Sequence, residues 1–232
     1  MKKNIFILLL SLVCLFSEAQ VSESITVKAG EDLQTVLSSH GLYRFPSFKR
    51  GVVTLRDGSM AAALMNFNIF LNEMQFIDPK GDTLVIAEPA TIDSISIDSA
   101  LFYYKKGYLQ VVENQAAAKL VMKQKITFIP VKIGAYGTTS QSSAIDNYRS
   151  LMSPVFAHNN VLALNEDIIV KKETNYSIIY KKFREAAATR SGFQTAFPDH
   201  KKAIDDYISS EKIDFRKESD LKKLLLFCTQ QS

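Results

Sequence analysis

The sequence predicts an α+β protein: an antiparallel β meander, sandwich-like or partly closed into a barrel, followed by a small C-terminal helical segment. Two observations predict this class. Between residues 45 and 128, short segments rich in apolar residues alternate with regular turn signals such as Asp57-Gly58. Further along, beyond residue 173, apolar residues recur at the three- and four-residue spacing that is typical of helices.

The first residues have the layout of a secretory signal peptide. Two lysines precede an apolar run over residues 5–16, and Ser17-Glu18-Ala19 offers small residues for a cleavage site before Gln20. The run is shorter than the roughly 20 residues that cross a bilayer. We therefore expect residues 1–19 to be a signal peptide, and the mature chain to be periplasmic, outer-membrane-associated or secreted.

The start of the mature chain predicts a strand at residues 24–28 and a short helix at residues 31–39. Acidic residues at positions 31 and 32 favour a helix N-terminus, and Gly41 is placed to end the helix. This stretch superficially looks like the opening of a peptidoglycan-binding LysM repeat. The chain then continues with YRFPSFKRGVV instead of the second helix of that module, so we do not adopt the LysM interpretation.

Residues 20–172 are predicted to form the antiparallel β domain. Its turns use the Asp-Gly, Pro-x-Gly and Lys-Lys-Gly sequences that suit reversals of the chain. The predicted strands are residues 52–55, 61–70, 73–77, 83–87, 92–97, 101–104, 108–112 and 120–128.

A polar loop at residues 133–153 is the candidate binding segment. It is rich in Gly, Ser and Thr, and long structureless loops in compact domains are often functional. Tyr136, Asp146, Asn147 and Tyr148 combine the residue types that suit adaptable recognition, and we treat them as candidate binding residues. A surface loop without a partner is the competing interpretation.

Residues 173–232 are predicted to form a helical segment that packs on itself or on the sheet. Its helices are expected to begin near Ile178, at Phe197-Pro198-Asp199 and at Glu218. Cys228 lies in the apolar stripe of the last helix, which predicts a buried structural thiol.

The stretch ATIDSISIDSALFYY contains the best candidate for a pair of carboxylates. Asp93 and Asp98 are separated by an odd number of residues, so a regular strand directs them to opposite faces. We therefore expect a strand with Ile95 and Ile97 in the core, and both aspartates in turns.

Four segments together form a pattern that covers most of the mature chain. They are FPSFKRGVVTLRDGSMAAALMNFNIFLNEMQFID, TIDSISID, KIGAYG and FPDHKKAIDDYISSEKIDFRKESDLKKLL. The pattern includes a pair of asparagines, Asn66 and Asn68, and the Glu73-x-x-Phe76 strand. It resembles an uncharacterised family of secreted proteins of Gram-negative bacteria. The resemblance implies an exported β-rich domain with C-terminal helices, and it brings no known activity.

The sequence assigns no catalytic residue, metal ligand or cofactor. The three histidines, His40, His158 and His200, are far apart and lie in no paired ligand motif. The chain contains neither a Gly-x-Ser-x-Gly nucleophile motif nor a phosphate loop ending in Lys-Ser or Lys-Thr. Catalytic carboxylates from distant strands would leave no such local motif.

These observations favour an exported, non-enzymatic binding or interaction protein of the cell envelope. The expected partner is an envelope protein or polysaccharide, recognised through the polar loop or the mildly basic helical end. A nucleic-acid partner is not expected, and neither is a transmembrane segment in the mature chain. The alternatives are an envelope hydrolase that uses dispersed Asp and Glu residues, and a structural subunit with an unpaired edge strand. Oligomeric state is left open.

Overall fold

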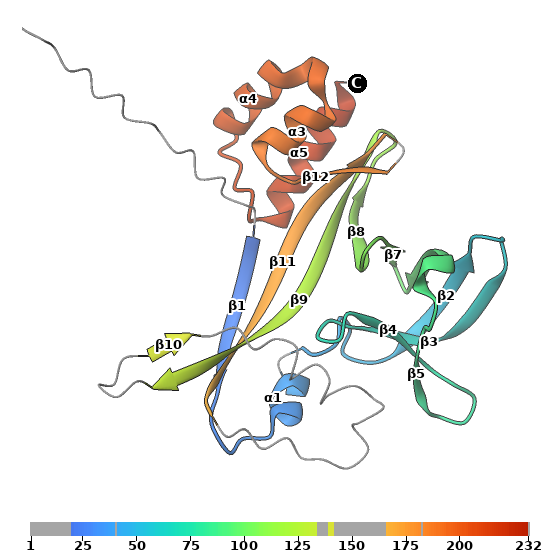
Figure 1. Cartoon of the computed structure of the whole chain (residues 1–232). Coiled ribbons are helices and arrows are strands. Elements are labelled where there is room, and N and C mark those ends of the chain that lie inside the picture. Colours follow the sequence, from blue (N-terminus) through green and yellow to red (C-terminus); the bar gives the residue numbers. More distant parts are fainter. Residues whose placement is uncertain (1–19, 40, 134–138, 142–165, 182, 232) are drawn as a thin grey trace, which may run out of the picture.

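The computed structural model describes residues 20–39, 41–133, 139–141, 166–181 and 183–231 (Figure 1). The predicted signal peptide and most of the predicted polar loop therefore lie outside the described residues. Among the residues that are described, no helix is both long enough and apolar enough to cross a membrane.

Nearly half of the described residues belong to one antiparallel sheet. Its strands are β1 (Gln20–Val27), β2 (Lys49–Leu55), β3 (Met60–Asn68), β4 (Glu73–Ile77), β5 (Thr83–Val85), β6 (Ile92–Ile97), β7 (Ala100–Tyr104), β8 (Tyr108–Asn114), β9 (Ala118–Ile133), β10 (Thr139–Gln141), β11 (Ile168–Tyr180) and β12 (Arg184–Ala187). The strand order is β1-β11-β9-β8-β7-β6-β2-β3-β4-β5, with β10 paired to β9 and β12 paired to β11.

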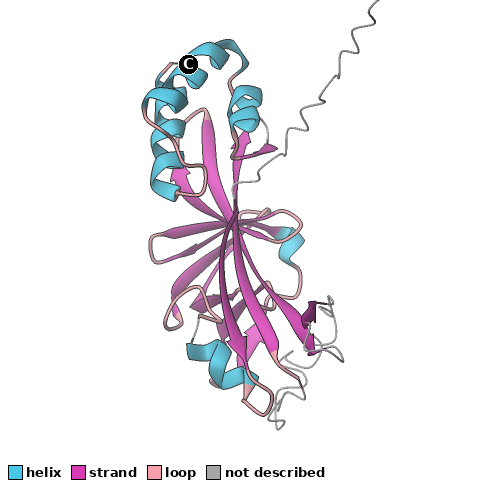
Figure 2. Ribbon diagram, turned by 90° about the vertical axis from the view of Figure 1, so that its left-hand side faces the viewer, coloured by secondary structure: helices cyan, strands magenta, loops and turns pink. Residues whose placement is uncertain are grey.

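The helices lie near the two ends of the long strands β1, β9 and β11 (Figures 1 and 2). Helix α1 (Leu33–Ser39) lies at one end. The C-terminal helices α3 (Arg190–Ala196), α4 (Lys201–Ser210) and α5 (Glu218–Gln230) lie at the other, with the single turns η1 (Pro89–Thr91) and η2 (Pro198–His200) elsewhere in the chain. The predicted α+β class is confirmed, with a meander that the described strands leave open.

All eight strands predicted between residues 45 and 128 are present, as β2 to β9. The turn residues explain this agreement. Gly58 and Gly81 have φ values of 86° and 92°, and such left-handed backbone favours glycine. The sheet bends strongly (Figure 1), and Phe70 after β3 packs edge-on against Phe128 of β9, with ring centroids 4.9 Å apart.

The strand β6 spans the predicted residues 92–97, and it contains a bulge at its start. Opposite it, Thr54 pairs with Ser94 but Leu55 pairs with Ile92, which leaves Asp93 as the extra residue. The bulge lets Ile92 point into the core together with Ile95 and Ile97. Asp93 is the exposed extra residue of the bulge. It therefore belongs to strand β6 and not to the preceding turn, where it was expected.

The predicted helix at residues 178–188 is wrong. Residues 168–180 pair along their whole length with β9, and residues 184–187 turn back as β12. Ile178 and Ile179 are both buried, but on opposite faces of the sheet, so neighbouring apolar residues imitated a helical stripe.

Helix α3 was not predicted, although a local start signal exists. The Thr189 hydroxyl accepts a hydrogen bond from the Gly192 backbone N–H, which caps the helix. Gly192 is required for close packing, because a Cβ atom there would overlap the carbonyl oxygen of Ala187. Phe193 is fully buried against the last two helices and the sheet.

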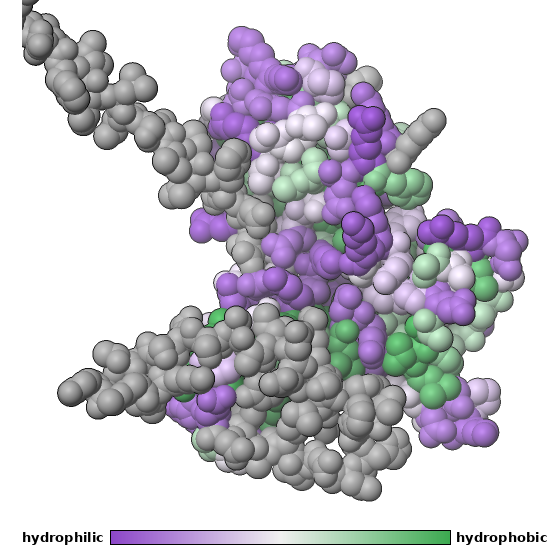
Figure 3. Space-filling model, in the orientation of Figure 1, coloured by the Kyte–Doolittle hydropathy of each residue, from purple (hydrophilic) through white to green (hydrophobic). Residues whose placement is uncertain are grey.

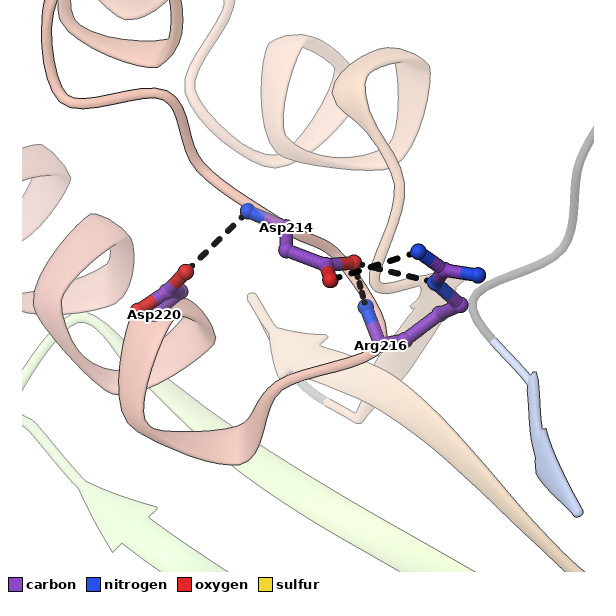
Figure 4. A network of polar contacts seen from close by, with 3 residues as sticks. All are labelled: Asp214, Arg216 and Asp220. Carbon is purple, nitrogen blue, oxygen red and sulfur yellow. Dashed lines mark hydrogen bonds and ion pairs between the residues drawn. The ribbon is translucent and has the colours of Figure 1, made fainter.

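Helix α5 starts at Glu218 as predicted, whereas α4 starts at Lys201, directly after the turn η2 that occupies the predicted start at Pro198. The buried side chains of α5 are Leu221, Leu224, Leu225 and Cys228, which confirms the buried position of this cysteine. The connection between α4 and α5 is held by polar contacts around Asp214 (Figure 4). Its backbone N–H donates to Asp220 at 3.1 Å, and its carboxylate accepts hydrogen bonds from the Arg216 backbone and guanidinium.

Two apolar cores lie on the same face of β9 and β11. One, beneath α1 and the bent part of the sheet, contains Ile126, Phe128, Ile168 and Val170. The other, beneath the C-terminal helices, contains Ala118, Leu120, Met122, Tyr176 and Ile178. Between them on that face lies the register pair Gln124 and Thr174, which leaves the middle of the sheet polar.

Candidate functional site

The four candidate binding residues Tyr136, Asp146, Asn147 and Tyr148 lie outside the described residues. Their role stays a prediction. The described residues instead bring polar groups together at the middle of the long strands, with a different set on each face of the sheet.

On the face that carries the two cores, we define the polar gap as Arg44, Gln110, Gln124, Lys172 and Thr174. Gln124 Nε2 donates a hydrogen bond to Thr174 Oγ1 at 3.2 Å, which forms a polar rung between β9 and β11. Lys172 lies one step along the same face of β11, opposite Ile126. Its neighbour on β1 is Glu23, and no ion pair joins these two described residues.

Arg44 reaches this gap from the segment between α1 and β2. Its backbone N–H donates to the Phe67 carbonyl at 2.9 Å, which anchors the segment to β3. Its Nε donates to Gln110 Oε1 at 2.6 Å, a contact between residues 66 positions apart. Within the described residues, the two terminal guanidinium nitrogens of this half-buried side chain make no hydrogen bond or ion pair.

Tyr176 and Glu218 border the polar gap on the side of the C-terminal helices. The tyrosine hydroxyl donates to Glu218 Oε2 at 3.3 Å. Burial, together with the nearby negative charge of Glu218, raises the pKa of Tyr176 to about 12, and the charge of Arg44 opposes this rise. The guanidinium of Arg44 is therefore near enough to Tyr176 to act on it electrostatically.

A shallow hollow opens at the same place. It is lined by Phe67, Phe102, Tyr108, Gln110, Met122 and Gln124, and it has no enclosed room for a ligand. Pockets for small molecules usually measure about 300–1,000 Å³. Among these described lining residues there is no carboxylate, so the paired acids that would favour the hydrolase are not found at this hollow.

On the opposite face, lysines gather over β9 and β11, and we call this surface the lysine face: Lys119, Lys123, Lys125, Lys171 and Glu173. The register of β9 and β11 is unbroken, so alternation places all five side chains on one side. Figure 3 shows a hydrophilic band across the middle of β1, β11 and β9, between the helical end and the lower end of the molecule.

Glu173 lies at the centre of two ion pairs on the lysine face. Its Oε2 is 2.7 Å from Lys125 Nζ, and its Oε1 is 2.8 Å from Lys171 Nζ. Burial alone would raise the pKa of Glu173, but hydrogen bonds and charge from the two lysines outweigh it and hold this pKa below its usual range. The carboxylate is therefore ionised at neutral pH.

The other two lysines of this face have neutral partners. Lys119 Nζ donates to the Tyr103 hydroxyl at 2.8 Å and lies 4.9 Å from the centroid of that ring. Lys123 Nζ donates to the Lys106 carbonyl at 2.9 Å. The face as defined therefore carries four ammonium groups and one carboxylate, of which only Lys125 and Lys171 contact the carboxylate, and its net charge is positive.

The aspartates of the ATIDSISIDS stretch do not form a site. Asp93 and Asp98 are both exposed, and five residues of strand span about 16 Å. Catalytic carboxylate pairs lie about 5–10 Å apart. Asp98 instead pairs with Lys49, with 2.9 Å between Oδ2 and Nζ. In the described part of the chain, no group of three or more His, Cys, Asp or Glu residues is arranged to hold a metal ion.

Comparisons with family models, curated proteins and solved structures found no match for this chain. The resemblance to secreted Gram-negative proteins therefore stays a prediction. Neither the polar gap nor the lysine face was predicted from the sequence. The lysine face had a local signal, since Lys123 and Lys125 are two apart within a predicted strand and Lys119 immediately precedes it. The polar gap had none, because its residues come from four distant segments.

Proposed function

We propose that this chain is an exported, non-enzymatic binding protein of the cell envelope, and that its lysine face binds an acidic polysaccharide. Export follows from the predicted signal peptide at residues 1–19. The observation that carries the binding proposal is the set of four lysines on a single face of β9 and β11, two of which pair with the one carboxylate of Glu173.

The spacing of the lysines suits a linear polyanion. Residues two apart on one strand lie about 7 Å from each other, and neighbouring strands lie about 5 Å apart. Lys123 and Lys125 are two apart on β9, and Lys171 lies on the adjacent strand. Several negative charges along one extended polymer can therefore each meet a different ammonium group.

The neutral groups of the face fit a sugar polymer. Ser22 and Ser24 on β1 stand next to Glu173 and Lys171 in register, and Asn175 stands opposite Lys123. Hydroxyl and amide groups beside ammonium groups supply hydrogen bonds for the sugar hydroxyls. The tyrosine ring under Lys119 adds an apolar surface on which a sugar ring can pack.

The test is binding of the purified protein to polygalacturonate, a linear polymer of carboxylated sugars, with neutral dextran of similar mass as the comparison polymer. We expect binding to polygalacturonate alone, with an affinity that falls as salt is raised, because exposed charges are screened beyond about 8 Å at physiological ionic strength. Equal binding to both polymers, or binding to neither, would refute the proposal.

Two matched double variants distinguish a loss of binding at the lysine face from an effect of the total charge of the protein. Lys119→Met with Lys123→Met removes two ammonium groups whose partners are neutral, so Glu173 keeps both of its ion pairs. We expect affinity for polygalacturonate to fall about tenfold, since each exposed ion pair contributes about 1 kcal/mol or less. Lys201→Met with Lys202→Met makes the same change of charge on α4 and is expected to leave the affinity nearly unchanged.

A further inference from the structure

We infer that the polar gap is a second binding site, for an oxyanion of the carboxylate or phosphate type, and that Arg44 and Lys172 are its two cationic ligands. This site lies on the opposite side of the sheet from the lysine face, because Lys171 and Lys172 are consecutive residues of one strand. The two binding proposals are therefore independent of each other.

The first argument is the state of Arg44. Its side chain is half-buried, yet among the described residues its only polar partner is the neutral amide oxygen of Gln110. A guanidinium presents five N–H donors in a planar fork that matches carboxylate and phosphate oxygens. With Nε held by Gln110, the orientation of the fork is fixed while its terminal nitrogens retain their donors for a ligand.

The second argument is the position of Lys172. Its Nζ lies near Gly41, 3.7 Å from where a Cβ atom would stand, so the side chain extends toward the segment that carries Arg44. It makes no ion pair with another described residue. A second cation on the same side of the same gap raises the positive potential there, which favours an anion over a neutral ligand.

The third argument is the set of neutral groups around the two cations. Gln110, Gln124 and Thr174 lie on three strands in the order β8, β9 and β11, which together span about 10 Å. Amide and hydroxyl groups can donate to further oxygens of a bound anion. The apolar side chains at the floor of the hollow, including Phe67 and Met122, limit access of water and strengthen such contacts.

The size of the hollow limits what enters it. The hollow is a shallow depression with no enclosed room for a ligand, so an anion would be held at its surface by the groups around it. The inference is therefore that one carboxylate or phosphate group is held end-on, with the remainder of its carrier outside the gap. The acidic groups that face the gap are Glu23 on β1 and Glu218 on α5, which lie at its two sides.

The test titrates the purified protein with inorganic phosphate and, separately, with succinate, and follows backbone amide chemical shifts by NMR at constant ionic strength. We expect saturable shifts at residues 41–45, 110, 124 and 172–176 with at least one of the two anions. Saturation by phosphate alone identifies a phosphate group as the natural ligand group, and saturation by succinate alone identifies a carboxylate group. Shifts that do not saturate with either anion would contradict the inference.

Two variants and one matched control complete the experiment. Arg44→Gln and Lys172→Met are each expected to raise the dissociation constant of the saturating anion at least tenfold. Lys201→Met removes an exposed lysine on α4, outside both proposed sites, and is expected to leave the dissociation constant within twofold. If Arg44→Gln does not fold, Lys172→Met alone decides, because this side chain has no ion pair to lose among the described residues. Unchanged affinity in Lys172→Met would overturn the assignment.

Discussion

At the scale of single residues, alternation along β11 separates two kinds of chemistry. Lys171 belongs to the lysine face and is paired with Glu173 at 2.8 Å. Lys172, the next residue, belongs to the polar gap and has no such partner among the described residues. Two adjacent and identical side chains therefore differ in their surroundings, because successive residues of a strand point to opposite faces.

We predict that Glu173→Gln lowers the free energy of unfolding by about 1–2 kcal/mol at pH 7, because a buried, doubly paired carboxylate is replaced by a neutral amide. The folded-state pKa of Glu173 lies below its unfolded value, so the ionised carboxylate stabilises the protein at higher pH. This stabilisation disappears as pH falls through the folded-state pKa.

Urea unfolding of wild type and Glu173→Gln between pH 3 and pH 7 measures this effect. The difference between the two proteins should be constant above about pH 5 and should shrink as the pH falls further. A difference that stays the same down to pH 3 would show that the ionised form of Glu173 does not stabilise the fold.

Cys228 gives a second residue-scale prediction. Burial raises the pKa of its thiol to about 12, so the reactive thiolate is scarce at pH 8. We expect iodoacetamide to leave Cys228 unmodified in the folded protein at this pH and to modify it fully in 8 M urea. Mass spectrometry of the C-terminal peptide distinguishes the two states, and rapid modification without urea would show that α5 opens readily.

At the scale of elements, packing at the C-terminal helices determines stability at that end of the sheet. Leu224 is fully buried in the core between α5 and the sheet, whereas Leu226 is 42% exposed. We predict that Leu224→Ala lowers the free energy of unfolding by about 2–5 kcal/mol. Chemical denaturation provides the measurement.

Leu226→Ala is the matched control for that prediction. It makes the same chemical change two residues further along the same helix, where the side chain is partly in water. We expect a loss of about 0.5 kcal/mol, as for other surface substitutions. Similar losses in the two variants would mean that α5 does not pack on the sheet through the face that contains Leu224.

The elements also show what the sequence can and cannot predict. The strands β2 to β9 were predicted because their turn residues fix the reversals locally, as Gly58 and Gly81 do. The end of β11 and β12 were mistaken for a helix, because Ile178 and Ile179 are buried on opposite faces of the sheet. A strand buried on both faces has no alternating pattern by which to recognise it.

At the scale of the whole molecule, the long strands connect two apolar cores through a polar middle. The polar rung of Gln124 and Thr174 lies between Ile126 of one core and Met122 of the other. The two faces of this middle region carry the polar gap and the lysine face. The sheet thus separates the two proposed binding sites, so a ligand at one would not block the other.

This arrangement could not be predicted from the sequence, for a physical reason. Arg44 and Gln110 are 66 residues apart and meet only because the sheet bends and its strands pair in one register. Register between distant strands depends on the packing of the whole sheet, and no local pattern encodes it. The lysines of β9 did form a local pattern, but their partner Glu173 lies on a strand distant in sequence.

The most direct test of the central claim is lysine acetylation footprinting of the purified protein with and without polygalacturonate. Limited acetylation is read residue by residue by mass spectrometry. We predict that the polymer protects Lys119, Lys123, Lys125 and Lys171 and leaves Lys172, Lys201 and Lys202 as reactive as before. Protection confined to Lys201 and Lys202, or equal protection of Lys171 and Lys172, would contradict binding at the lysine face.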